Sequence, residues 1–270
     1  MKIYLSVDME GITAVASREE VTKGEHDYLA AQVQMTRETS AACEGAFSAG
    51  ASEVLVKDAH WTGRNIEPTG LVAPEGKRIS LIRGWSGHPF SMVQGLDESF
   101  DAVGFIGYHA GAASDGNPLS HTLSSRVIAK LTINGVVASE FLLFSYAASL
   151  VKVPVVFLSG DRKLCEAAKR INEGLVTVPT FEGQGASIVS SAPDESIRNI
   201  RLGMETAVRL RRGRVLPLPK EFSVEVTFKD HADAYRKSFY PGAKQTGDFD
   251  VRFEASDYFE VLRMLKFMTS

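Results

Sequence analysis

Two acidic side chains follow the first apolar run of the chain at a spacing that could support catalysis. Asp8 and Glu10 come directly after the apolar segment 1–7, and Gly11 then allows a sharp turn. Alternate residues of a strand point to the same side, so both carboxylates would leave the strand end together. Like charges held this close repel, and one takes up a proton unless a cation neutralises both. The pair is therefore either part of a metal site or two solvated turn acids.

The same pattern recurs twice further along the chain. The apolar segment 52–56 leads through Asp58 to His60, and the apolar segment 100–108 is followed directly by His109. Ligands of open α/β sheets gather at the carboxyl ends of the strands, so these side chains are expected at one edge of a sheet. Taken singly, either histidine could be an ordinary hydrogen-bonded residue. The acid before His60 either supports a liganded histidine or only closes its strand.

A further acid, Glu140, begins an apolar helix, where a carboxylate also suits the helix dipole. The predicted metal ligands are Asp8, Glu10, His60, His109 and Glu140. A catalytic zinc takes three protein ligands, whereas five ligands with one bridging carboxylate suit two ions about 3.5–4 Å apart. Asp8 is the natural bridge because it ends the first strand. Imidazole favours zinc, and a water shared by two zinc ions becomes a nucleophile that can hydrolyse a peptide or amide bond.

One more histidine follows the third of these strands. His121 lies beyond the small-residue loop 111–119, so it could lean over the same site. There it could donate to a developing oxyanion or pass a proton to the leaving amine. The five predicted ligands do not include it, which leaves it available for catalysis.

Composition restricts the class of protein. The 270 residues are 44% hydrophobic and 23% charged with a formal net charge of −3, which gives no electrostatic case for binding nucleic acid or an anionic membrane. The two cysteines, Cys43 and Cys165, allow no disulfide framework, which fits a reducing compartment. Neither a signal-peptide pattern nor an apolar run of membrane-spanning length is present. We therefore expect a cytoplasmic protein.

Apolar strands and helices alternate along most of the chain, which predicts an α/β fold. Segments with helical periodicity or helix-start signals lie at about 28–49, 141–150 and from Pro193 onward, and further apolar strands are expected at 153–158 and 175–180. The predicted architecture is a layered sheet with helices on both faces and the metal site at the C-terminal ends of the strands.

The segment 216–219, Leu-Pro-Leu-Pro, is a predicted boundary because two prolines interrupt any regular element. We expect a catalytic α/β domain over 1–215 and a small α+β lobe over 216–270, either as a separate unit or packed as part of one domain. The lobe should contain strands at 222–228 and 250–255 and helices at 232–238 and 258–268. Asn134-Gly135 between apolar runs predicts a type I′ hairpin turn.

Together these motifs resemble the D-aminopeptidase family of metallopeptidases. The resemblance covers most of residues 1–140 and consists of SVDMEG (6–11), VLVKDAH (54–60), PFSMVQGLD (89–97), GYHA (107–110), LSHT (119–122) and ING (133–135). Two departures are visible: Ser139 precedes Glu140 where the family has glycine, and the segment 13–23 does not match the typical member.

The resemblance implies a dinuclear zinc site at the five predicted ligands, two Zn²⁺ per chain, with His121 as the catalytic side chain. It also implies an aminopeptidase that releases the N-terminal residue of short peptides or aminoacyl amides. The expected assembly is a homo-oligomer, a decamer of two pentameric rings.

Two other functions are compatible with strand-end aspartate and histidine. A dinuclear metallophosphoesterase is one, but the chain lacks the Gly-Asp-x-x-Asp and Gly-Asn-His signatures of that class. A non-catalytic metal- or peptide-binding homologue is the other. His121 distinguishes this last alternative, because a protein that only binds has no need of it.

Overall fold

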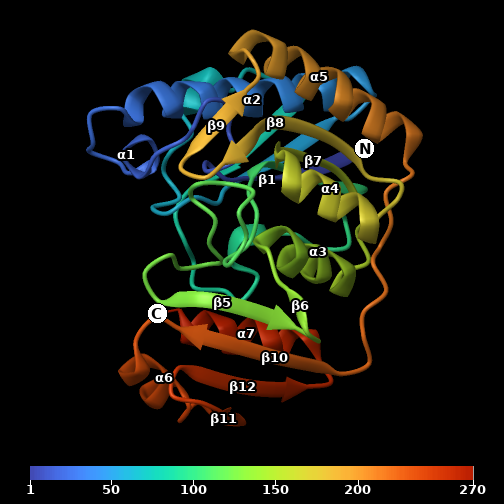
Figure 1. Ribbon diagram of the computed structural model, residues 1–270. Helices are drawn as coiled ribbons and strands as arrows, with labels where there is room; N and C mark the ends of the chain where they lie inside the picture. Colours follow the sequence, from blue (N-terminus) through green and yellow to red (C-terminus); the bar gives the residue numbers. More distant parts are fainter. Residues whose placement is uncertain (270) are drawn as a thin grey trace.

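A seven-stranded sheet lies at the centre of the larger part of the molecule (Figure 1). The computed structural model describes residues 1–269. The strand order is β3-β2-β1-β4-β7-β8-β9, and every pair is parallel except the final hairpin. The strands are β1 (Lys2–Val7), β2 (Glu53–Asp58), β3 (Arg78–Ile82), β4 (Ala102–Tyr108), β7 (Val155–Asp161), β8 (Val176–Gln184) and β9 (Ser187–Ser190).

Helices cover both faces of this sheet (Figure 1). On one face α2 (Tyr28–Ser48) packs against α5 (Pro193–Leu210), and on the other lie α3 (Glu140–Leu150) and α4 (Arg162–Ile171). The central strands β1, β4 and β7 are almost wholly buried because both of their faces are covered. The predicted α/β class with helices on both faces is confirmed.

A second sheet of five antiparallel strands lies beside the first, in the order β11-β12-β10-β5-β6. Its strands are β5 (Ile128–Ile133), β6 (Val136–Val137), β10 (Phe222–Phe228), β11 (Ala243–Gln245) and β12 (Asp250–Ala255). Helix α7 (Tyr258–Met268) packs between this sheet and α3, and α6 (His231–Lys237) packs against β10–β12. Both turn residues, Asn134 and Gly135, have positive φ, as a type I′ turn requires.

The C-terminal lobe is less independent than its sequence indicated. The predicted order of strands and helices after residue 216 is present, but the sheet takes two of its strands from the hairpin 128–137. The apolar cores are also continuous: the hydroxyl of Tyr258 in α7 donates to the carbonyl of Leu143 in α3 at 2.8 Å. The predicted boundary at 216 therefore does not coincide with the division between the two sheets, because the small sheet contains strands from both sides of it. β5 pairs with β10, which lies far along the chain, and this pairing could not be read from sequence proximity.

Two glycines allow the backbone to pack tightly beneath the carboxyl ends of the strands. A Cβ atom on Gly11 or on Gly160 would lie 1.9 Å from the carbonyl oxygen of Tyr108, the last residue of β4. Both positions must therefore be glycine for the two neighbouring segments to approach this carbonyl so closely. The contact fixes the ends of β1, β4 and β7 relative to one another.

Shorter elements complete the chain near the same edge. They are α1 (Arg18–Val21) and the 3₁₀ turns η1 (Pro68–Gly70) and η2 (Ser91–Val93). The segment 13–27 contains α1, which begins with a capping box between Ser17 and Glu20. Within residues 1–269, no helix combines the length and apolar character needed to cross a membrane.

Candidate metal centre

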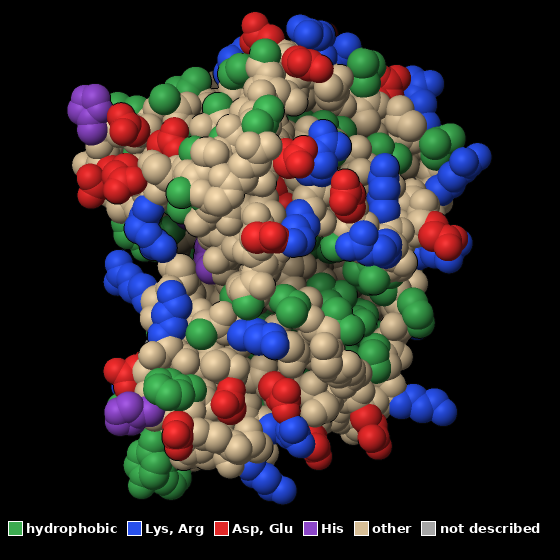
Figure 2. Space-filling model, viewed as in Figure 1, with side chains coloured by type: hydrophobic (Ala, Val, Ile, Leu, Met, Phe, Trp, Pro, Cys, Tyr) green, Lys and Arg blue, Asp and Glu red, His purple; other side chains and the backbone are tan. Residues whose placement is uncertain are grey.

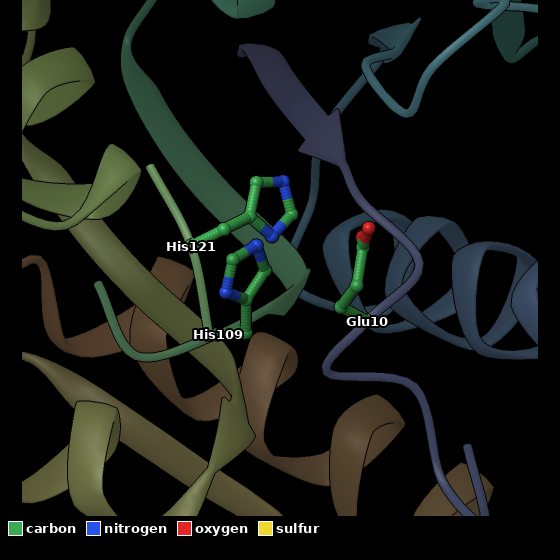
Figure 3. Close-up of side chains that lie close together, drawn as sticks. All are labelled: Glu10, His109 and His121. Atoms are coloured by element: carbon green, nitrogen blue, oxygen red, sulfur yellow. The ribbon is translucent and has the colours of Figure 1, made fainter. Parts of the chain in front are cut away.

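The five predicted ligands come together at one edge of the large sheet. Asp8 and Glu10 follow β1, His60 follows β2 and His109 follows β4, and these three strands are neighbours in the sheet. Glu140 reaches the same point from the first turn of α3, whose N-cap is the hydroxyl of Ser139. All five side chains are buried. Figure 3 shows the rings of His109 and His121 close together, with Glu10 across from them.

Asp8 lies between two groups of side chains. Its Oδ1 is 3.3 Å from His60 Nδ1, which is also 3.0 Å from Glu10 Oε2. Its Oδ2 is 3.6 Å from His109 Nε2, which is 3.7 Å from Glu140 Oε2. The two oxygens of one carboxylate therefore face different histidines, and each group has ligand atoms within 4.8 Å of one another. This is the arrangement expected of a carboxylate that contacts two cations.

Backbone carbonyls orient both imidazoles. His60 Nε2 lies 2.8 Å from the carbonyl of Val21 in α1, and His109 Nδ1 lies 2.9 Å from the carbonyl of Ala110. A carbonyl only accepts, so the nitrogen that faces it carries the proton and the other nitrogen faces the carboxylates. Metal-bound histidines are commonly held in this way by a hydrogen bond from the second nitrogen.

Burial and mutual charge shift the pKa values of the cluster. Burial, with a further contribution from Glu10, raises the pKa of Asp8 well above its usual value. Burial also acts to raise the pKa of Glu10, but the neighbouring His60 outweighs it and the pKa is lowered well below normal. Burial lowers the pKa of His109, but Glu140, Glu10 and Asp8 outweigh this and raise it to about 9. Without a cation, protons must compensate the carboxylates, and a metal ion would displace them.

Two atoms at the centre of the cluster indicate that the residues fit a metal. Glu10 Oε2 and His109 Nε2 are buried and take part in no hydrogen bond among residues 1–269. Buried polar atoms normally have partners, and leaving them without one is costly. Carboxylate oxygen and imidazole nitrogen in a compact group are the donors that zinc prefers among protein ligands. Coordination would supply the missing partner at both atoms.

The sixth predicted residue, His121, lies against the same cluster. Its ring stacks on that of His109, with centroids 4.5 Å apart and an interplanar angle of 22°. Its Nδ1 is 2.9 Å from the carbonyl of Leu119, which leaves Nε2 directed to the cluster, 3.9 Å from Glu140 Oε1. It is more exposed than the five buried residues and lines the adjoining cavity. The structure thus brings together all six residues that the sequence singled out.

Asp58 makes no hydrogen bond to the ring of His60, and it supports that histidine through the loop that follows β2. Its carboxylate accepts hydrogen bonds from the backbone N–H of Asn65, the side-chain amide of Asn65 and the backbone N–H of Ile66. The same amide donates to the carbonyl of His60. Asp58 therefore holds the loop that carries the histidine and makes no hydrogen bond to its ring.

Sequence reasoning did not predict the surrounding supports. The carbonyls of Val21 and Ala110 act through the backbone, which leaves no signal in residue type. Asp161, the last residue of β7, accepts from the backbone N–H of Ala110 at 2.6 Å and also caps α4. The only sign of this role in the sequence was the position of Asp161 at the end of an apolar strand.

A cavity of about 660 Å³ opens beside the cluster. Asp8, Glu10, His60, His121 and Glu140 line one side of it. The aromatic rings of Trp61 and Trp85 and the apolar side chains of α3 and α7 form further walls, and charged residues of α1 and Arg126 also line the cavity. In Figure 2 a histidine is visible in the hollow between the upper and lower parts, with Lys or Arg side chains nearby.

Comparison with known proteins gives consistent matches over the whole chain. The family described as D-aminopeptidase matches residues 1–267. A D-aminopeptidase of Bacillus subtilis (strain 168) is 31% identical over 273 residues, a match that covers 100% of this chain and 97% of the relative. A solved structure of Zn-dependent D-aminopeptidase DppA from Bacillus subtilis, a self-compartmentalizing protease, superposes with a TM-score of 0.91 at 29% identity. That comparison covers 100% of this chain and 97% of the other.

Proposed function

Because this chain belongs to the D-aminopeptidase family, we propose that it is a zinc-dependent aminopeptidase that releases an N-terminal D-residue from short peptides or aminoacyl amides. The observation that carries the proposal is the position of Asp8, whose two carboxylate oxygens face two separate histidines at the edge of the cavity. The zinc dependence and D-specificity of the relatives agree with it.

Two zinc ions per chain are the proposed cofactors. Asp8, Glu10 and His60 would hold one, and Asp8, His109 and Glu140 the other, so that Asp8 is shared. When bound, two such ions would supply Lewis acidity toward the scissile carbonyl and lower the pKa of a water toward neutrality. The backbone contacts of both histidines would keep their ligand nitrogens aimed at the ions without rearrangement.

His121 is the proposed catalytic side chain. Its Nδ1 is held by the carbonyl of Leu119, so its Nε2 is the nitrogen that can exchange a proton with the substrate. A protonated Nε2 can donate to the oxyanion that develops on the carbonyl, or give its proton to the leaving amine. A protein that only bound peptides would need no such group beside Glu140, which argues against a non-catalytic homologue.

The proposal is tested with the protein prepared with zinc and after chelation. D-alanine p-nitroanilide, L-alanine p-nitroanilide and p-nitrophenyl phosphate are offered at equal concentration. We expect zinc-dependent turnover of the D-anilide in large excess over the other two. Turnover of the phosphate ester alone would favour a phosphoesterase, and no turnover of any substrate with a full zinc complement would favour a binding protein.

The proposed assembly follows the solved relative, and the proposed location follows the cysteines. We expect a homo-oligomer, a decamer of two pentameric rings, and the self-compartmentalizing character of DppA supports an assembly of this kind. Cys43 and Cys165 are both free and buried, which agrees with a reducing compartment such as the cytoplasm. Light scattering at micromolar concentration tests the assembly, and a monomer would contradict it.

A further inference from the structure

Two arginines line the cavity on segments that also contact the metal centre. Arg18 lies in α1, one turn before Val21, whose carbonyl holds His60. Arg126 lies three residues beyond Leu123, whose N–H donates to Glu140 Oε1. Each arginine is thus only three residues from a backbone group that touches a predicted ligand.

A hydrogen bond between residues that line the cavity connects these segments. Arg18 Nη1 donates to the hydroxyl of Ser125 at 3.2 Å, next to Arg126 in sequence. The two arginines therefore lie on adjoining segments of the cavity wall. Among residues 1–269, neither arginine has a carboxylate within ion-pair distance. Glu19, Glu25 and Lys266 also line the cavity, so its wall carries charges of both signs and is not uniformly positive.

We infer that Arg18 and Arg126 form a subsite for the C-terminal carboxylate of a short peptide substrate. The inference rests on the proposed function, because a peptide cleaved at its first bond must have its N-terminal residue at the metal centre. The free carboxylate then lies at the other end of the bound peptide. Guanidinium groups are the side chains best suited to bind a carboxylate, since they offer several N–H donors in a planar fork.

The size of the cavity fits this assignment. A dipeptide spans about 7 Å and a tripeptide about 10 Å when extended. Either fits within a cavity of about 660 Å³, whereas a longer chain would have to extend beyond it. The subsite would therefore select di- and tripeptides with a free carboxylate over longer or amidated chains.

The test compares D-alanylglycine with D-alanylglycine amide, which share the scissile bond and differ only in the terminal charge. A charge-assisted contact of this kind should give the free dipeptide about a 10–100-fold higher kcat/KM. The double variant Arg18→Gln, Arg126→Gln should bring this ratio close to one, with most of the loss on the free dipeptide. Arg198→Gln, an exposed position of α5 outside the cavity, is the matched control and should keep the ratio.

A binding measurement separates this inference from the proposed function. The analogue of the dipeptide in which CH₂–NH replaces the peptide bond is titrated by calorimetry, as free acid and as amide, into the zinc-loaded protein. Tighter binding of the acid that is lost in the double variant supports the subsite even if neither peptide is cleaved, a result that would overturn only the aminopeptidase activity. Equal use of acid and amide by the wild type, or a preference that persists in the double variant, overturns the subsite and leaves the activity standing.

Discussion

The rings of His109 and His121 stack with their centroids 4.5 Å apart, and only His109 faces the oxygens of Asp8. Two stacked imidazolium ions would repel each other, so the pair works best when His109 is neutral. Binding to a metal ion requires that neutral form. The contact therefore places His121, the proposed catalytic side chain, directly against a histidine that the proposed metal ions would require to be neutral.

Replacing His121 by alanine should keep the metals and lower the rate. General acid–base or oxyanion assistance is worth about 10²–10⁴-fold, so kcat should fall by that factor with little change in substrate affinity. Zinc content and kcat are measured on the same sample. A variant that loses zinc and recovers activity in excess zinc would show instead that His121 is a ligand, which its grouping with Glu10 and His109 makes the main alternative.

Replacing Asp8 by alanine should remove both metals, because its two oxygens face both halves of the cluster. Metal analysis by mass spectrometry after desalting measures the zinc-to-chain ratio, expected to fall from two to near zero. Asp27→Ala, an exposed acid before α2, is the control and should keep the full complement. Retention of one zinc in the Asp8 variant would contradict the shared role.

The metal-free protein should lose stability as the pH rises. The folded pKa of His109 is about 9 against an ordinary value near 6.5, so folding favours its protonated form. Its contribution is complete below about pH 6.5 and is lost as the pH rises through about 9. Urea unfolding of chelated protein at pH 6.5, 8 and 9.5 measures this, with His109→Gln as the variant that should lose the dependence. If the two chelated proteins had the same free energy of unfolding at each of the three pH values, the prediction would be contradicted.

Asp58→Asn should weaken zinc binding without touching a ligand. The substitution removes the charge that accepts three N–H groups from Asn65 and Ile66 and so loosens the loop that carries His60. Loss of such a support typically costs about 10–100-fold in metal affinity. Competition with a zinc chelator measures the affinity. Asp97→Asn, whose carboxylate accepts from Ser99 in an exposed turn, is the matched control, and an equal effect in both variants would refute the assignment.

Gly160→Ala should destabilise the fold severely, because the new Cβ would lie 1.9 Å from the carbonyl oxygen of Tyr108. Crowding of backbone against backbone cannot relax as a side chain can, and we expect a loss of at least about 3 kcal/mol. Gly185→Ala provides the comparison: it has a positive φ of 60° but open space around it, and should cost only about 1–2 kcal/mol. Thermal or urea unfolding measures both, and similar values would contradict the steric argument.

Much of this protein was readable from local patterns. The central strands are continuous apolar runs, and Asp8, His60 and His109 each follow one of them closely, which predicted their meeting at the carboxyl edge of the sheet. The Asn134-Gly135 turn was readable for a similar reason, since both residues tolerate the positive φ that they adopt. Patterns of this kind act over a few residues, and they survive folding because burial on both faces of a parallel sheet admits few other side chains.

What the sequence determined by itself is the set of side chains capable of the chemistry: Asp8, Glu10, His60, His109, His121 and Glu140. Only the tertiary structure decided which atoms meet. The division of Asp8 between two histidines, the carbonyl of Val21 behind His60 and the shared wall of Arg18 and Arg126 all join segments far apart in the chain. The small sheet likewise unites residues 128–137 with 222–255. Such contacts depend on how whole layers pack, and packing is set by burial of surfaces summed over many residues, which no local spacing records.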